Sequence, residues 1–327
     1  MRDIQEIRAD IASIDEQIIA LNRKRMQLTE EVVEYRLSVG KKIFDFTPVE
    51  EFDFRNATVV FQGVEGAYSQ QALQEFFGAD TESYHVDTWR EAMEAITGGK
   101  ADYAVLPIEN SSAGIVSENF DLLAEYDACI IGEQIIKIDH CLIGLKDTEL
   151  SDITDVYSHP QALMQCSRYL KEHSGWELHS TKNTAGSALK VQQDRKKNKA
   201  AIAAKITADL YDLKALAEGI QNNTSNFTKF IIVTGKKIFR KTANKISLCF
   251  EIPRANESGS LYYTLSHLIY NNLNMNKIES RPIQGKAWEY RFFIDIEGNL
   301  TDGAVQNALN GLEDVTVDLQ ILGNYES

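Results

Sequence analysis

The feature that most constrains the fold is a regular alternation of strand-like and helix-like segments between about residues 57 and 235. Short apolar runs such as ATVVFQG, YAVLPIEN and KFIIVTG are typical of buried strands, and stretches such as SQQALQEFF and SENFDLLAEY are typical of helices. This alternation predicts an α/β fold with parallel sheets and helices on their faces. Ligands of such folds bind where strand carboxyl ends meet helix starts. We therefore expect this block to carry the binding site. The same criteria predict one helix over QALMQCSRYLKEH and another over DLYDLKALAEGI.

Two further blocks flank the central one. Residues 1–45 begin with a long helix that we expect to end near Gly40, followed by a linker that contains Pro48. Residues 244–323 give the order strand, helix, strand, strand, helix, strand, which is the ferredoxin-like βαββαβ arrangement. This last block has few reactive side chains, so we expect a regulatory or dimerising module. The first helix is predicted from apolar residues spaced three or four apart, namely Ile4, Ile7, Ile11, Ile14, Ile18, Leu21, Leu28 and Val32.

Composition excludes several classes of protein. A chain of 327 residues predicts two or three domains, and a net charge of −14 without a basic stripe argues against nucleic-acid binding. No apolar run reaches the roughly 18–20 residues that span a bilayer, and the N-terminus lacks the apolar core of a signal peptide. We expect a cytoplasmic protein that does not contact membranes. The four cysteines are far apart, which predicts free, mostly buried thiols and no metal site. We also expect no cofactor.

Several junctions in the central block are rich in small hydroxyl and amide side chains. Such residues are ordinary helix caps, but several helix starts in one cleft would also bind a dianion without a dense arginine cluster. The sequence contains no GxSxG motif, Cys–His pair or P-loop, and His159 is more typical of a helix start than of a general base. Any chemistry must therefore rely on weak acids and oriented donors. The junctions are residues 66–69, 109–114, 158–161, 183–186 and 226–230.

Five ordered motifs give the central block a family resemblance. The strings FQGVEGAYSQQA, VLPIENSSAGIV, YSHPQALMQC, NTAGSA and NFTKF occur in this order, and residues 57–235 resemble a prephenate dehydratase domain. The resemblance implies a two-lobed fold like that of periplasmic binding proteins. Residues 244–323 resemble the ACT domain fused to these enzymes. Residues 1–45 resemble the first helix of the chorismate mutase domain that precedes many of them, as in bifunctional chorismate mutase/prephenate dehydratases.

The resemblance also implies a reaction and its residues. Prephenate loses CO2 and its ring hydroxyl to give phenylpyruvate, a step in phenylalanine biosynthesis. The threonine tied to catalysis in the family corresponds to Thr228, whose hydroxyl is best described as a hydrogen-bond donor to the departing oxygen. Asn110, Ser158 and Gln165 match residues involved in binding or catalysis. The remaining substrate-binding candidates are Glu109, a supporting acid or a structural partner, with Ser111, Thr184, Phe227 and Lys229.

One residue departs from the family pattern. The motif usually reads Thr-Arg-Phe, whereas this chain has Thr228-Lys229-Phe230. A lysine keeps the positive charge but loses the bidentate geometry of a guanidinium group. Either the residue binds a substrate carboxylate less rigidly, or it packs structurally and little changes; both interpretations stay open.

The sequence leaves two alternative functions open. An arogenate dehydratase would differ only in an amine on the substrate side chain, although fusion to a mutase-like helix favours prephenate. A non-catalytic solute-binding or amino-acid-sensing protein would suit the two-lobed fold. The combination of Thr228 with Asn110, Ser158 and Gln165 argues against that second alternative, as does the absence of a signal peptide.

The last block matches two segments that bind phenylalanine in the family. These are Gly259, Ser260 and Leu261, and then Glu279, Ser280, Arg281 and Pro282. They imply that L-phenylalanine is an allosteric inhibitor, with Ser260 at a position where alanine is commoner. The simpler interpretation is that Gly259 only forms a turn and Pro282 only ends a strand.

The N-terminal block carries residues at functional positions of the mutase family. They are Arg8, Arg25, Arg36 and Asp45, with Arg36 where a lysine is usual, and Arg25 could equally be an exposed arginine of a coiled-coil seam. Pro48 and the strand that begins near Thr58 leave no room for the second and third mutase helices. We therefore expect little or no chorismate mutase activity and a helix used for dimerisation, unless another subunit completes the site. A homodimer or homotetramer is predicted.

Overall fold

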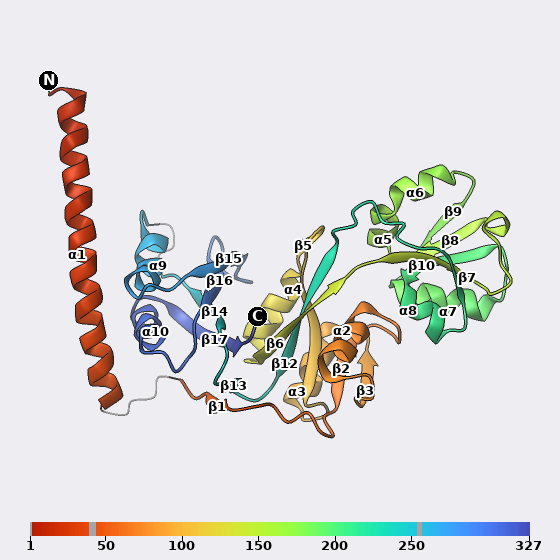
Figure 1. The fold of residues 1–327 in the computed structure, drawn as a ribbon, viewed down its shortest axis with the longest axis horizontal. Coiled ribbons are helices and arrows are strands. Elements are labelled where there is room, and N and C mark those ends of the chain that lie inside the picture. Colours follow the sequence, from red (N-terminus) through yellow and green to blue (C-terminus); the bar gives the residue numbers. More distant parts are fainter. Residues whose placement is uncertain (1, 39–43, 254–256) are drawn as a thin grey trace. The chain divides into compact units, whose positions relative to one another are not determined.

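The protein forms two compact units, described here from a computed structural model (Figure 1). The structure describes residues 2–38, 44–253 and 257–327. The first unit comprises residues 1–52, 129–131 and 237–327, and the second comprises residues 53–128 and 132–236. Within the described ranges, no helix is both long enough and apolar enough to cross a membrane.

The second unit has two lobes, and the first of them is built on a mixed sheet. Its strand order is β6-β12-β4-β2-β3, with β5 paired to β4. Strand β2 pairs in parallel with β3 and β4, whereas β12 is antiparallel to β4. Thr88 and Glu91 form a capping box that fixes the start of helix α3. The elements are β2 (Val59–Gln62), α2 (Tyr68–Phe77), β3 (Ser83–Val86), α3 (Trp89–Thr97), β4 (Tyr103–Asn110), β5 (Gly114–Ile115), α4 (Ser117–Glu125), β6 (Cys129–Lys137) and β12 (Phe227–Thr234).

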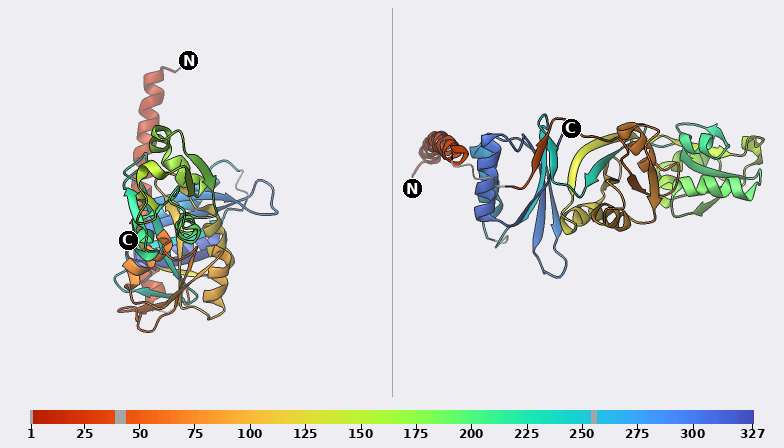
Figure 2. Two further views of the ribbon diagram at one scale, coloured as in Figure 1. Left: turned by 90° about the vertical axis from the view of Figure 1, so that its right-hand side faces the viewer. Right: turned by 90° about the horizontal axis from the view of Figure 1, so that it is seen from below.

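The second lobe is a sheet covered by helices on both faces, in the order β11-β7-β10-β8-β9 (Figures 1 and 2). Ala201 and Ala203 of β10 pack in the core cluster that includes residues of α7 and α8. Ala200 and Ile202 pack in the opposite cluster, with residues of α5 and α6. Burial of both faces explains why this strand is apolar throughout. The elements are β7 (His140–Gly144), the 3-10 helix η1 (Leu150–Asp152), β8 (Asp155–Ser158), α5 (Pro160–Gln165), α6 (Ser167–Glu172), β9 (Glu177–Ser180), α7 (Thr184–Asp194), β10 (Lys199–Ala204), α8 (Lys205–Leu210) and β11 (Lys214–Ala217).

The chain passes between the two lobes twice, from β6 to β7 and from β11 to β12 (Figure 1). The loop before α2 also contacts the second lobe. Gly66 has φ +82°, and a Cβ atom there would lie 2.5 Å from Cγ2 of Thr207 on α8. Tyr211 donates its hydroxyl hydrogen to the backbone oxygen of Glu65 at 2.6 Å. Only glycine suits this turn, and it allows the lobes to approach closely.

Two helix predictions in the second lobe are corrected by the structure. The stretch QALMQCSRYLKEH forms two short helices, α5 and α6, which are separated at Cys166. The second half of DLYDLKALAEGI is strand β11, so the helix predicted there is wrong. Asp212 has a left-handed φ of 55° that ends the helical path, and Ala215 then pairs with Ile143 of β7. Pairing at a sheet edge outweighs the weak local helical preference.

The first unit contains a four-stranded antiparallel sheet of order β15-β16-β14-β17, the ferredoxin-like order, with α9 and α10 between its strands in sequence. Leu248, Phe250 and Leu309 are fully buried in its core. The segment predicted as a linker contains the short strand β1, in which Thr47 pairs in parallel with Ile238 of β13. The elements are α1 (Ile4–Ser38), β1 (Thr47–Val49), β13 (Ile238–Arg240), β14 (Lys245–Glu251), α9 (Ser260–Tyr270), β15 (Met275–Pro282), β16 (Tyr290–Glu297), α10 (Gly303–Val315) and β17 (Val317–Tyr325).

Helix α1 is a single helix of 35 residues. The predicted end at Gly40 lies outside the described residues. The apolar residues that predicted this helix are all exposed in the single chain, from Ile7 at 37% to Leu21 at 66%. The four cysteines are buried free thiols, as predicted.

Candidate active site

A cleft of about 800 Å³ lies within the second unit. It is lined by side chains of both lobes, and the strands β4, β8 and β12 end or begin at it. Four of the nine residues proposed from the family resemblance for catalysis and substrate binding line this cleft: Asn110, Gln165, Thr184 and Thr228.

Asn110 and Thr228 face each other across strands β4 and β12. The Oδ1 atom of Asn110 accepts backbone N–H groups of Ser112 at 3.0 Å and Ala113 at 2.8 Å, which fixes the orientation of the amide. Its Nδ2 atom then donates to Oγ1 of Thr228 at 2.9 Å and lies equally close to Oδ1 of the buried Asn226. Because Thr228 accepts this bond, its own hydroxyl hydrogen is left to donate to a molecule in the cleft.

Two other junctions form the helix caps expected of their residue types. Asn183 caps α7 by accepting the N–H of Gly186 at 2.6 Å, and a Cβ atom at Gly186 would lie 2.7 Å from that same Oδ1 atom. His159 caps α5 through Nδ1, which accepts the N–H of Gln161 at 3.2 Å. The interpretation of His159 as a helix-start residue is confirmed. Thr184, the first residue of α7, and His159 both face the cleft.

Ser158 and Lys229 lie outside the set of residues that line the cleft. Ser158 is completely buried, and its Oγ donates to the backbone oxygen of Ile202 at 2.6 Å, which ties β8 to β10. Lys229 lies between Thr228 and Phe230, which both line the cleft, and its Nζ is 3.6 Å from Oε2 of Glu133 on β6. The ammonium group of Lys229 is thus close to a carboxylate of strand β6.

The remaining candidates lie next to the cleft. Ser111 accepts the N–H of Phe227 at 2.9 Å and donates to the backbone oxygen of Ser225 at 3.1 Å, so it holds together the two segments that carry Asn110 and Thr228. Phe227 is 39% exposed. Glu109 pairs in register with Lys229.

The cleft also contains residues to which the family resemblance assigned no individual role. Lys182 is an exposed cation that precedes the capping Asn183. Burial raises the pKa of Tyr68 well above its ordinary value, so this phenol stays protonated. Trp89 has a buried indole N–H that has no hydrogen-bond partner among the described residues. The lining further includes His140.

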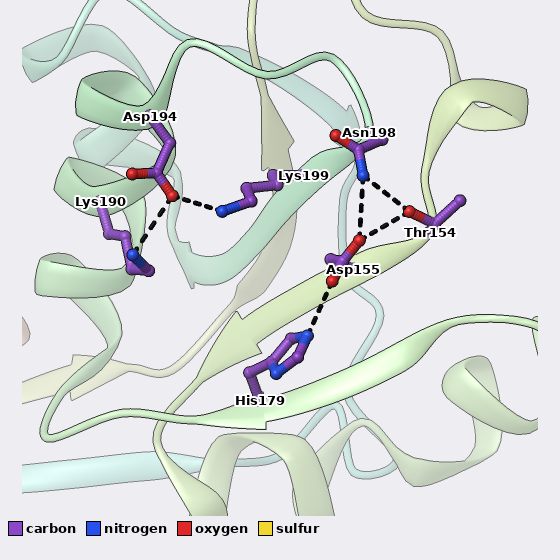
Figure 3. A network of polar contacts seen from close by, with 7 residues as sticks. All are labelled: Thr154, Asp155, His179, Lys190, Asp194, Asn198 and Lys199. Atoms are coloured by element: carbon purple, nitrogen blue, oxygen red, sulfur yellow. Dashed lines mark hydrogen bonds and ion pairs between the residues drawn. The ribbon is translucent and has the colours of Figure 1, made fainter.

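One cluster outside the cleft has the residue types of a metal site. Asp155, Glu177 and His179 place one ligand atom each within 4.8 Å of one another. Figure 3 shows that the Asp155 carboxylate is already engaged by His179 Nε2 at 2.8 Å, Thr154 Oγ1 at 2.6 Å and Asn198 Nδ2 at 3.0 Å. These hydrogen bonds hold the pKa of Asp155 below its ordinary value, with Thr154 the largest cause. The cluster is a network that joins β8 and β9 to the turn before β10.

The effector and mutase candidates lie in the first unit. Gly259 starts helix α9 with φ +85°, and residues 279–282 end the edge strand β15. Arg8 and Asp45 are exposed, whereas the guanidinium of Arg25 lies 4.0 Å from the ring centroid of Tyr270. The side chain of Arg36 is outside the described part of the structure.

Comparisons with known proteins agree with this geometry. The prephenate dehydratase family matches residues 59–238. The bifunctional chorismate mutase/prephenate dehydratase of Escherichia coli (strain K12) is 34% identical over 275 residues, which are 83% of this chain and 71% of that protein. The enzyme of the same name from Aquifex aeolicus is 29% identical over 360 residues, covering 99% of this chain and 98% of that protein.

A solved structure supports the same assignment. The prephenate dehydratase of Arthrobacter aurescens in complex with L-phenylalanine is 32% identical, with a TM-score of 0.76 over 83% of this chain and 90% of that chain. The family match covers all of the residues that line the cleft, including Asn110 and Thr228. The chain therefore belongs to the prephenate dehydratase family.

Proposed function

We propose that the cleft converts prephenate into phenylpyruvate, CO2 and water. The observation that carries this proposal is the bond from Asn110 Nδ2 to Thr228 Oγ1, which leaves the threonine hydrogen available to donate to a substrate in the cleft. In the reaction, the bond between the ring and its carboxylate breaks, and its electron pair enters the ring. The bond from the ring to the hydroxyl oxygen breaks, and the oxygen leaves as water after taking up a proton from solvent.

The role of Thr228 is to stabilise charge as it develops on the departing oxygen. A threonine hydroxyl is a weak acid, so it donates a hydrogen bond and keeps its proton. Formation of an aromatic ring and release of CO2 favour the reaction, so modest assistance is sufficient. Gln165 would supply a second neutral donor.

The substrate is a dianion, and the protein has a net charge of −14. Binding therefore depends on local donors. The starts of α2 and α7 reach the cleft through Tyr68 and Thr184, and backbone N–H groups at helix starts favour anions. Lys182 adds a positive charge at the same place. These groups could bind the two carboxylates without an arginine cluster.

A substrate series on the purified protein tests the proposal. Rapid formation of phenylpyruvate from prephenate supports it. A rate on arogenate that exceeds the rate on prephenate would assign the chain as an arogenate dehydratase instead. Tight binding of prephenate without turnover would indicate the solute-binding alternative and contradict catalysis.

We further propose that L-phenylalanine inhibits the enzyme through the first unit. Leu261→Ala is expected to weaken inhibition while turnover without phenylalanine stays normal, because Leu261 lies in the matching segment at the start of α9, in a different unit from the cleft. Tyr262→Ala, which removes an exposed neighbour on the same helix, is the matched control. The rate of turnover is measured across phenylalanine concentrations for the wild type and both variants. Equal wild-type rates at zero and millimolar phenylalanine would rule out regulation. The two ligands must weaken each other's binding by the same factor.

Little or no conversion of chorismate to prephenate is expected from the N-terminal helix. The rearrangement depends on groups held around a compressed conformer, whereas Arg8 is exposed and Arg25 lies against Tyr270. An assay of chorismate consumption checks this. Ordinary enzyme rates that are lost in Arg25→Ala would show that the helix contributes to a working mutase site.

The protein is expected to be a homodimer or homotetramer. Apolar side chains of α1, such as Ile11 at 52% and Leu21 at 66% exposure, are uncovered in the single chain. Burying a seam of this kind requires a partner helix. Sedimentation at micromolar concentration measures the assembly, and a strictly monomeric species would contradict the expectation.

A further inference from the structure

His140 is a buried histidine at the point where the chain enters the second lobe. It is the first residue of β7, is 2% exposed and pairs in register with Ala204 of β10. Its backbone N–H donates to Oε1 of Gln221 at 2.9 Å, and its backbone oxygen accepts the N–H of Ile220 at 3.1 Å. These contacts fix the position of the residue without using its ring.

The ring of His140 joins one side chain from each lobe. On the second lobe, Nε2 lies 2.9 Å from Oε1 of Gln165. On the first lobe, the hydroxyl oxygen of Tyr68 lies 3.2 Å from Nδ1 and 2.9 Å from the backbone oxygen of Asp139, so its single hydrogen can be shared between these two acceptors. Tyr68, His140 and Gln165 all line the cleft, so the chain of contacts spans it.

The charge state of the ring follows from its surroundings. Burial lowers the pKa of His140 below its ordinary value, although the bond to Gln165 and the charge of Asp139 act in the opposite direction. The Asp139 carboxylate is engaged by Lys137 at 2.9 Å and by Gln221 at 2.7 Å. The ring is therefore neutral near pH 7, with a single N–H group to donate.

Gln165 needs this donor to present the correct end of its amide. When Nδ1 accepts from Tyr68, the one ring hydrogen is on Nε2 and donates to Oε1 of Gln165. The amide nitrogen of Gln165 is then free to donate toward the cleft, as binding a dianion requires. The backbone oxygen of Gln165 accepts the N–H of Asn222 at 2.6 Å, which holds the end of α5 in place. In this arrangement the His140 ring favours the orientation of the Gln165 amide in which Oε1 points to the ring. The other orientation has the same shape and differs only in the exchange of the amide oxygen and nitrogen.

We propose that His140 is a positioning residue for the dehydration, holding the Gln165 amide with its nitrogen toward the substrate. The inference rests on the proposed function, since it assigns a role within that reaction. The wild-type assay on prephenate decides the function itself, and the variants below are compared with that rate. If the role proposed for His140 is wrong, the wild-type rate on prephenate is not affected.

The test is a double-mutant cycle between His140 and Gln165. His140→Leu is expected to lower kcat by about tenfold, the upper end of what one hydrogen bond contributes, with a smaller change in KM. His140→Gln carries an amide donor near the former Nε2 position and is expected to recover most of kcat. In a Gln165→Met background, His140→Leu should cost nothing more, since it acts through the missing amide.

A matched control separates positioning from loss of local structure. Gln221→Met removes the acceptor of the His140 backbone N–H and the bond to Asp139, but it leaves the two ring contacts in place. It is expected to lower the melting temperature while kcat stays near the wild-type value. A folded His140→Leu variant with wild-type kcat would overturn the proposal, as would losses from His140→Leu and Gln165→Met that multiply independently.

Discussion

Thr228→Ala is expected to lower kcat for prephenate by about 10²–10³-fold, the usual cost of removing one oriented donor from a transition state. The residue accepts a bond from Asn110 Nδ2 at 2.9 Å, so its hydrogen is the part available to the departing oxygen. The fold should persist, because Thr228 is only partly buried and its strand β12 stays paired with β4. Steady-state kinetics measures kcat, and a thermal melt of the same preparation shows whether the fold persists.

Thr228→Ser is the control for this substitution. Serine keeps the hydroxyl and loses only a methyl group, so most of kcat should remain. A Thr228→Ala variant with near-normal turnover would remove Thr228 from the mechanism. Equal losses in the alanine and serine variants would show that packing of the methyl group, rather than hydrogen bonding, is important.

Asn110→Asp is expected to lower kcat by about 10²-fold without a change of shape. A carboxylate can still accept the N–H groups of Ser112 and Ala113, but it cannot donate to Thr228 as the amide nitrogen does. The Thr228 hydroxyl would then donate to this carboxylate instead of to the substrate. The loss should appear in kcat, and the added negative charge should also raise KM for the dianion.

Ser112→Asp separates the effect of charge from the effect of the lost donor. Ser112 lies in the same loop, and its hydroxyl accepts from Asn223 at 3.2 Å. The variant should raise KM and leave kcat near normal. Wild-type kcat in Asn110→Asp would contradict the proposed orientation of the Thr228 hydrogen.

Local patterns in the sequence were sufficient to predict many of the helices and strands. Strand and helix alternation predicted an α/β unit, and the spacing of Ile4, Ile7 and Ile11 predicted the helix that runs from Ile4 to Ser38. Caps could be predicted too, because His159 hydrogen-bonds to an N–H group only two residues away. These features depend on contacts between near neighbours, so periodicity and residue type are enough to predict them.

Other features depend on residues that are far apart in the chain. Lys214–Ala217 is a strand because β7 offers an unpaired edge about 70 residues earlier in the sequence. Ser158 is turned into the β8–β10 interface, and Lys229 toward Glu133, although their motifs suggested the cleft. The local sequence does not show which face of a sheet meets another element.

The cleft also combines features that the sequence predicted with contacts that depend on residues far apart in the chain. Motifs identified Asn110 and Thr228 as candidates, and the strand register of β4 and β12 brings them to 2.9 Å. Tyr68, His140 and Gln165 are separated by up to about a hundred residues, and no spacing predicts that they meet. The sequence determined which chemical groups were available and which local elements would form. Only the tertiary structure decided which donors face one another, because burial and hydrogen bonding between distant segments fix their orientation.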